Sequence, residues 1–83
     1  MKVLRFENRE IEVEKVHDKG WEGLVLFDQT ENQYYLYDLL WHGGGYVDRV
    51  LKISKVEYLE FEGLSFPESS QLVRTIAERN SSS

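Results

Sequence analysis

The chain has 83 residues, which suits one small domain with a core large enough to fold alone. It contains no cysteine, and this excludes disulfides, thiol nucleophiles and thiolate metal sites. Fifteen acidic and ten basic residues give a net charge of −5, which repels nucleic-acid backbones and suits a basic partner.

Membrane insertion and export are not expected. No apolar run approaches the roughly 20 residues that a membrane-spanning helix requires, so we expect no membrane partner. The N-terminal stretch MKVLRFENRE carries charges too frequently for the apolar core of a signal peptide. A cytoplasmic protein is the simplest interpretation.

The first part of the chain predicts two strands joined by a tight turn. VLRF (3–6) and EIEVEKV (10–16) flank a polar turn at 7–9, and apolar and acidic residues alternate in the second run as in a half-buried strand. The acidic side chains of that strand are Glu10, Glu12 and Glu14. We interpret them mainly as a solvated face, and alternatively as an electrostatic landing site for a positive protein surface.

The middle of the chain predicts three more strands. WEGLVLFD (21–28) is rich in strand formers, is expected to be covered on both faces, and contains Gly23 as the site of a bend or bulge. Residues 34–41 and 46–53 are predicted to form a hairpin closed by the loop His42-Gly43-Gly44-Gly45. This loop is either a loose connection or a mobile tip that orders when a partner docks.

Aromatic residues are concentrated in this hairpin, and aromatic side chains on strands are more often core than surface. We expect Tyr35, Tyr37 and Leu39 mainly in the core. The candidates for an exposed partner-binding patch at the loop are Tyr34, Trp41, His42 and Tyr46. The same aromatics could instead stack on single-stranded nucleic acid, although the nearby charges are mixed rather than positive.

The end of the chain changes in character. Residues 56–61 are predicted to form a sixth strand, and Pro67 marks the start of an amphipathic helix at about 67–79. We therefore predict one all-β domain at 1–80, a small SH3-like or Sm-like bent barrel of five or six strands with one short C-terminal α-helix. Residues 81–83 are expected to be a disordered tail.

Catalytic motifs are incomplete. His42-Gly43-Gly44-Gly45 resembles the HGGG element of some esterases and lipases, but no G-x-S-x-G nucleophile motif accompanies it. The loop also lacks the Gly-Lys-Ser/Thr of a phosphate loop, and neither histidine, His17 or His42, belongs to a ligand-spaced pair. No catalytic residue, metal or cofactor is predicted, and the enzyme hypothesis ranks last.

The stretch from Tyr34 to Phe61 resembles the late strands of Sm-like and SH3-like small barrels. More narrowly, it is similar to the Rof family of Rho-termination inhibitors and to WYL ligand-sensing modules. Arg49, Leu51 and Ile53, followed by Val56, carry the likeness, which covers about a third of the chain. The resemblance implies the barrel rather than an activity, and the N-terminal helix common in those barrels is missing here.

The leading functional hypothesis is a non-catalytic protein-interaction module, a small acidic inhibitor or adaptor that binds a basic protein surface. The alternative is a small barrel that binds single-stranded nucleic acid, and the third hypothesis is a small-ligand-sensing module. The oligomeric state is left open by the sequence.

Overall fold

The computed structural model describes residues 2–81. Within this range the chain forms the strands β1 (Lys2–Phe6), β2 (Arg9–Asp18), β3 (Leu24–Asp28), β4 (Gln33–His42) and β5 (Gly45–Ile53), then the helices α1 (Lys55–Gly63) and α2 (Glu68–Ser81). A single 3₁₀ turn, η1 (Gly20–Glu22), precedes β3. Ser81 is the last residue of α2, so it does not belong to a tail as predicted, and residues 82 and 83 lie outside the described part of the chain.

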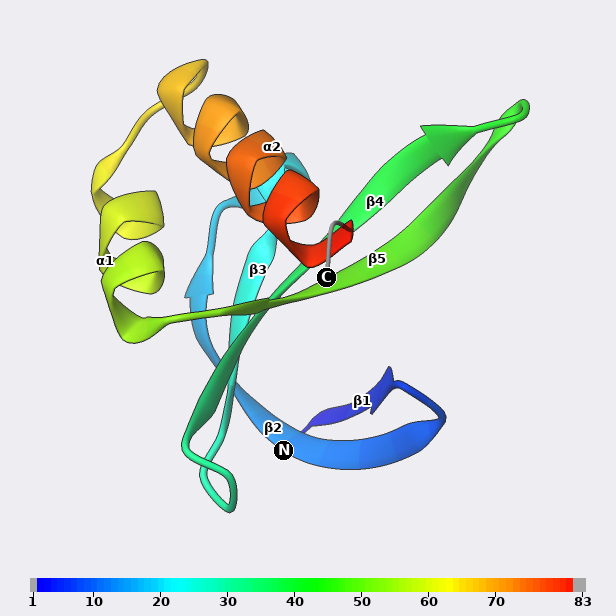
Figure 1. Cartoon of the computed structure of the whole chain (residues 1–83), viewed down its shortest axis with the longest axis vertical. Helices are drawn as coiled ribbons and strands as arrows, with labels where there is room; N and C mark the ends of the chain where they lie inside the picture. The colour runs from blue at the N-terminus through cyan, green and yellow to red at the C-terminus, as the bar shows by residue number, and fades with distance from the viewer. Residues whose placement is uncertain (1, 82–83) are drawn as a thin grey trace.

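The strands form one antiparallel sheet in the order β1-β2-β3-β4-β5 and curl into a half-barrel (Figure 1). In the described part of the chain each strand pairs only with its sequence neighbours, so β1 and β5 are the two edges of the sheet. The mostly β prediction is confirmed. The strict all-β prediction is wrong, because two helices follow the sheet instead of one.

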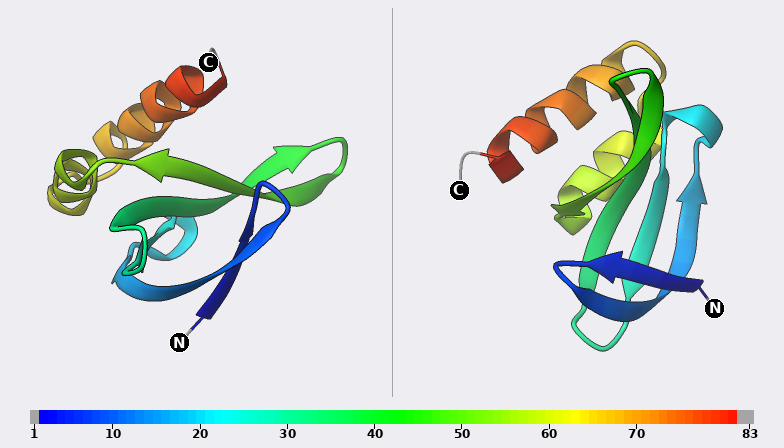
Figure 2. Two further views of the ribbon diagram at one scale, coloured as in Figure 1. Left: turned by 60° about the horizontal axis from the view of Figure 1, so that its bottom comes forward. Right: turned by 90° about the vertical axis from the view of Figure 1, so that its right-hand side faces the viewer.

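The sheet separates two hydrophobic cores. Figure 2 shows the helices on one side of β5 and the curled β1–β2 hairpin on the other. The helix-side core consists of Val25, Leu36, Leu51, Ile53, Phe61, Val73 and Ile76. The strand-side core consists of Leu4, Ile11, Val13, Leu26 and Tyr35. Because neighbouring residues of a strand point to opposite faces, β3 and β4 contribute to both cores, as was predicted for residues 21–28.

Strand β2 also contributes to both cores, and it contains one irregularity. Ile11 and Val13 belong to the strand-side core. The pairing with β3 then shifts between Lys15 and His17, as in a β-bulge, and Val16 packs against the helix-side core. Val16 lies on the opposite face from Val13 by the ordinary alternation of a strand, and the bulge brings His17 to the helix side as well, where it packs edge-on against Phe61.

Two tight turns use the left-handed backbone region. Glu7 and Asn8 have φ angles of 52° and 65°, which agrees with the tight hairpin predicted there. Gly43 and Gly44 have φ angles of 58° and 90° and connect the paired residues His42 and Gly45. The predicted four-residue loop is therefore a two-residue turn, and Gly45 already belongs to β5.

The strand predicted at residues 56–61 is wrong, because these residues belong to α1. Ser54 begins this helix with a capping box: its hydroxyl accepts from the Glu57 N–H at 3.1 Å, and the Glu57 carboxylate accepts from the Ser54 N–H at 2.8 Å. Phe61 anchors the helix in the helix-side core. The capping box and this tertiary contact favour a helix, and they outweigh the β-forming residues of the segment.

Strand β3 is shorter than predicted. Trp21 lies in η1 rather than in a strand and is exposed. The bend predicted at Gly23 is present: its φ is 138°, and an added Cβ would lie 3.2 Å from Leu36 Cδ1 and 3.3 Å from the Tyr37 carbonyl oxygen. Glycine is required here by both its backbone conformation and the close approach of β4.

Helix α2 agrees with the helix predicted at 67–79 to within two residues at its ends. It packs on the sheet through Val73 and Ile76. No helix within residues 2–81 has the length and apolar character needed to cross a membrane.

Candidate functional site

The outer half of the β4–β5 hairpin, residues 39–47, extends beyond the rest of the molecule, and we call it the arm (Figure 1). Five large apolar side chains of the arm are between 41 % and 67 % exposed. They are Leu39, Leu40, Trp41, Tyr46 and Val47. Exposed apolar residues are ordinary when scattered singly, but five on one short hairpin form a patch that requires an explanation.

The strand register distributes these side chains over both faces of the arm. Leu40 lies opposite Val47, on the face that continues the helix-side core. Trp41 lies opposite Tyr46 on the other face, with ring centroids 5.1 Å apart and ring planes at 73°. This edge-to-face geometry is a favourable one for aromatic pairs. The arm is thus apolar on both sides, beyond the reach of either core.

Polar contacts hold the base of the arm. Arg49 donates to both carboxylate oxygens of Asp38, from Nε at 2.9 Å and from Nη2 at 2.6 Å, and Asp38 is buried. This hydrogen bonding raises the pKa of Arg49. On the opposite face, a hydrogen bond to Asp48 raises the pKa of the Tyr37 hydroxyl. Both pairs lie across the two strands, so they hold the register from which the arm extends.

A cleft of 810 Å³ lies beside the base of the arm and follows the outer edge of β5. Val73 and Ala77 of α2 line one wall, Phe6 and Glu7 line another, and Val50 lies between them. Val50 of β5 therefore lies in the wall of a hollow that is partly apolar.

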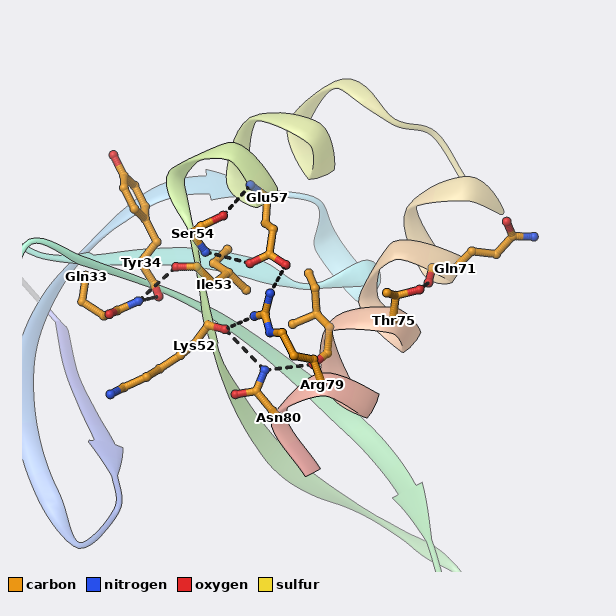
Figure 3. A network of polar contacts seen from close by, with 11 residues as sticks. Gln33, Tyr34, Lys52, Ile53, Ser54, Glu57, Gln71, Thr75, Arg79 and Asn80 are labelled. Carbon is orange, nitrogen blue, oxygen red and sulfur yellow. Dashed lines mark hydrogen bonds and ion pairs between the residues drawn. The ribbon is translucent and has the colours of Figure 1, made fainter. Parts of the chain in front are cut away.

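Helix α2 covers the edge of β5 further along the strand. The Lys52 carbonyl oxygen accepts from Arg79 Nη2 at 2.9 Å and from Asn80 Nδ2 at 3.4 Å (Figure 3). Arg79 also forms an ion pair with Glu57 of α1. These contacts tie both helices to the end of β5, and they mark the point where its edge stops being accessible.

The structure brings together three of the predicted binding residues. Trp41, His42 and Tyr46 are all exposed and lie next to the turn. Tyr34 is not part of this patch, because it lies at the far end of β4, half-buried between Phe27 and Tyr58. The ring centroids are 4.6 Å from Phe27 and 5.0 Å from Tyr58. The prediction of Tyr34 as an exposed loop residue is therefore wrong.

The predictions of core residues in β4 are also partly confirmed and partly wrong. Tyr35 is 1 % exposed, which confirms its prediction, and Tyr37 is half-buried. Leu39, which was predicted to be core, is exposed on the arm. The residues that sequence reasoning missed are Leu40 and Val47. A two-residue turn at Gly43–Gly44 would have identified them as an opposed pair near the tip.

The acidic residues of β2 lie on a separate element. Glu10, Glu12 and Glu14 are exposed on the face of β2 that points away from Ile11 and Val13. Their surroundings are not purely acidic. Arg5 lies opposite Glu10 in the register, and Glu14 accepts a hydrogen bond from Gln29 at 3.2 Å.

The histidines do not come together. His17 packs edge-on against Phe61 with its Nδ1 3.8 Å from Glu62, whereas His42 lies at the tip of the arm. Among residues 2–81, no three acidic or histidine side chains are grouped so that they could hold a metal ion. No protein-family model, curated protein or solved structure matches the chain.

Proposed function

We propose that the protein is a non-catalytic protein-interaction module that binds a partner protein through the arm. One observation carries the proposal: five large apolar side chains are exposed on both faces of a paired hairpin that extends beyond both cores. Contiguous apolar patches on a surface are typical of interaction sites. Trp and Tyr, which form the tip, are enriched among the residues that contribute most to protein–protein binding.

The arm is preformed, which supports the same proposal. Its strands pair as far as the two-residue turn, and the Asp38–Arg49 ion pair holds its base. A preformed element loses little conformational entropy on association, so more of the apolar burial contributes to affinity. This favours docking of an ordered arm over a loose glycine tip that orders on binding.

The acidic residues of β2 support a finer proposal about a second surface. Glu10, Glu12 and Glu14 all face solvent on a chain with a net charge of −5. Such a face suits a basic protein surface, in which case the protein acts as a small acidic inhibitor or adaptor. Charges of this kind act mainly on the association rate and on the choice of partner.

Two other functions have less support. Stacking of single-stranded nucleic acid on Trp41 and Tyr46 requires a positive groove, whereas Arg49 is engaged by Asp38 and Asp48 lies two residues from Tyr46. A small-ligand-sensing role would use the cleft beside α2. The rings of Trp41 and Tyr46 lie outside that cleft, so their exposure would stay unexplained.

We also propose a fold family and a cellular location for the protein. The curled meander of five strands supports kinship with SH3-like or Sm-like barrels, although β1 and β5 do not pair to close it. A chain without cysteine needs no oxidising compartment to fold, and we place it in the cytoplasm.

The test is a pull-down from an extract of the source cells with the tagged chain as bait. The arm variant is Trp41→Ala/Tyr46→Ala. The matched control is Val56→Ala/Leu59→Ala, which removes two apolar side chains that are also exposed, but on α1 and away from the cleft. We expect a protein that is retained by the wild type and the control and lost by the arm variant. Retention of the same proteins by all three baits would contradict the proposal.

A second comparison separates the arm from the acidic face. The triple variant Glu10→Gln/Glu12→Gln/Glu14→Gln keeps the arm and removes three carboxylates. A partner steered by charge is expected to be lost by this variant and at high salt, because screening weakens interactions between exposed charges. A partner that is lost only by the arm variant would assign recognition to the apolar residues alone.

A further inference from the structure

We propose that the arm binds a second copy of this chain, with β5 of one copy pairing antiparallel with β5 of the other to form a two-fold symmetric dimer. The inference rests on the proposed function, because it assigns a partner to the same arm. A strand added along the edge of β5 places its side chains beside Tyr46 and Val47, which lie on opposite faces of the arm. A surface packed on one face alone would leave the apolar residues of the other face exposed.

The hydrogen-bonding pattern of β5 decides which backbone groups a second strand can use. His42 and Gly45, which flank the two-residue turn, form a hydrogen-bonded pair, and such pairs alternate along an antiparallel ladder. Val47 and Arg49 therefore turn their backbone groups toward β4, whereas Tyr46, Asp48 and Val50 turn theirs outward. The outward carbonyl of Lys52, bound by α2, agrees with this alternation.

One antiparallel register pairs the β5 edges of two copies without placing like charges opposite each other. With Val47 on the two-fold axis, Tyr46 of one copy lies opposite Asp48 of the other, where the phenol can donate to the carboxylate. Val47 then packs against its symmetry mate. Moving the axis to Asp48 would place two carboxylates directly opposite each other, which is unfavourable.

The charge distribution favours a second arm over a basic partner at this position. Residues 39–47 contain no aspartate, glutamate, lysine or arginine, so the net charge of −5 is carried elsewhere on the chain. A basic surface would find no complementary charge on the arm. A second arm supplies a neutral apolar surface, and in the paired strands the acidic residue that enters the contact, Asp48, lies opposite Tyr46 rather than opposite another carboxylate.

The paired segment also fits the space that the fold leaves along β5. Lys52, where α2 covers the edge, lies roughly 17 Å along the strand from Val47. In this register the Gly43–Gly44 turn of the other copy arrives beside Val50, before that obstacle. The 810 Å³ cleft opens at this point, and a turn of two glycines can enter it because it carries no side chains.

The test is sedimentation velocity of the purified full chain over a concentration series up to about 100 μM, a range that detects micromolar dimers. The key variant is Asp48→Pro, which removes an outward N–H that β4 does not use and so blocks strand pairing between copies. Because it also removes the Tyr37–Asp48 hydrogen bond, Asp48→Ala, which loses that bond but keeps the N–H, is measured beside it and is expected to dimerise. The matched control is Val3→Pro, at an outward position of the other edge strand, β1. We expect the wild type and Val3→Pro to reach twice the monomer mass of 9.8 kDa, and Asp48→Pro to stay monomeric.

Circular dichroism of each variant checks that it is folded. If Asp48→Pro is unfolded, Val47→Arg is the deciding variant. It places two positive charges on the two-fold axis of the dimer, at a position that is exposed in the single chain. A dimer that survives the deciding variant would overturn strand pairing at β5. A wild type that stays monomeric would overturn the second copy as partner, and the arm-dependent pull-down would then decide the proposed function separately.

Discussion

Tyr35 and Trp41 point to the same face of β4, because they are six positions apart, yet Tyr35 is 1 % exposed and Trp41 is 61 % exposed. The difference lies in what covers that face. The β1–β2 hairpin packs over Tyr35, and Phe6 lies 5.2 Å from it between ring centroids. Trp41 is beyond the end of this cover, where, among residues 2–81, Tyr46 is the one ring in contact with it.

Substitution by alanine should separate the two residues. Tyr35→Ala is expected to cost about 3–5 kcal/mol, because it leaves a cavity in the strand-side core. Trp41→Ala is expected to leave the melting temperature within a few degrees of wild type, since its side chain stabilises the single chain little. Thermal unfolding followed by circular dichroism at low protein concentration measures both. Unfolding of the domain by Trp41→Ala would make Trp41 a core residue, and the binding site would then have to be sought on the acidic face of β2.

The candidate site could be predicted from the sequence in part, at this same scale. Trp41, His42 and Tyr46 follow from their position beside a glycine turn. The predictions for Tyr34 and Leu39 were both wrong: Tyr34 was expected at the surface but is half-buried, and Leu39 was expected in the core but is exposed. Alternation along a strand gives the face on which a residue lies, but not which element covers that face, and the cover comes from segments distant in sequence.

Helix α1 shows how an element is decided by its ends. The segment KVEYLEFEG contains Val, Tyr, Leu and Phe, which are typical of strands, and only one of its side chains, Phe61, is fully buried. The capping box of Ser54 and Glu57 was visible in the sequence as Ser-x-x-Glu, and it is the signal that should have outweighed the strand pattern. Arg79 of α2 then adds a contact that no local pattern contains.

The contact between the helices makes a prediction about pH. Burial raises the pKa of Glu57, but hydrogen bonds from Arg79 and from the Ser54 backbone lower it more, so the pKa lies below its ordinary value of 4.5. A lowered pKa in the folded state means that the ionised carboxylate stabilises the fold above about pH 4.5, and that this stabilisation is lost as the pH falls through the folded-state pKa. Glu57→Gln is expected to cost about 0.5 kcal/mol at neutral pH, as for exposed ion pairs.

Urea unfolding of wild type and Glu57→Gln at several pH values measures this effect. The difference in free energy of unfolding between the two proteins should be largest at neutral pH and should shrink below pH 4.5. Glu60→Gln, which removes an exposed carboxylate from the same helix, is the control. A difference that stays constant down to acid pH would contradict the stabilising ion pair with Arg79.

At the scale of the whole molecule, the sheet carries a core on each face and an arm that belongs to neither. Strands near each of the five observed positions and a C-terminal helix could be predicted from alternation and turn residues, whereas the sixth strand predicted at 56–61 is helix α1. The length by which β4 and β5 extend beyond both cores could not, because it depends on where α2 and the β1–β2 hairpin come to lie. The same reason explains why the cleft along β5 was not foreseen.

Amide hydrogen exchange should follow this division. Leu36 and Leu51 form a pair within the helix-side core, whereas Leu40 and Val47 form an equivalent pair on the arm. We expect the amides of Leu40 and Val47 to exchange at least about tenfold faster in the single chain, since few buried contacts oppose local opening there. Nuclear magnetic resonance at low protein concentration resolves these amides. Equal protection of the two pairs would mean that the arm opens only when the whole domain unfolds.

The participation of β2 in both cores has a consequence for how the molecule unfolds. Two cores on opposite faces of a sheet could in principle unfold one after the other, each independently of the other. Here β2 supplies Ile11 and Val13 to the strand-side core and Val16 to the helix-side core, from its two opposite faces. Loss of either core therefore frees the strand that the other depends on, so we expect the two cores to unfold in one cooperative step.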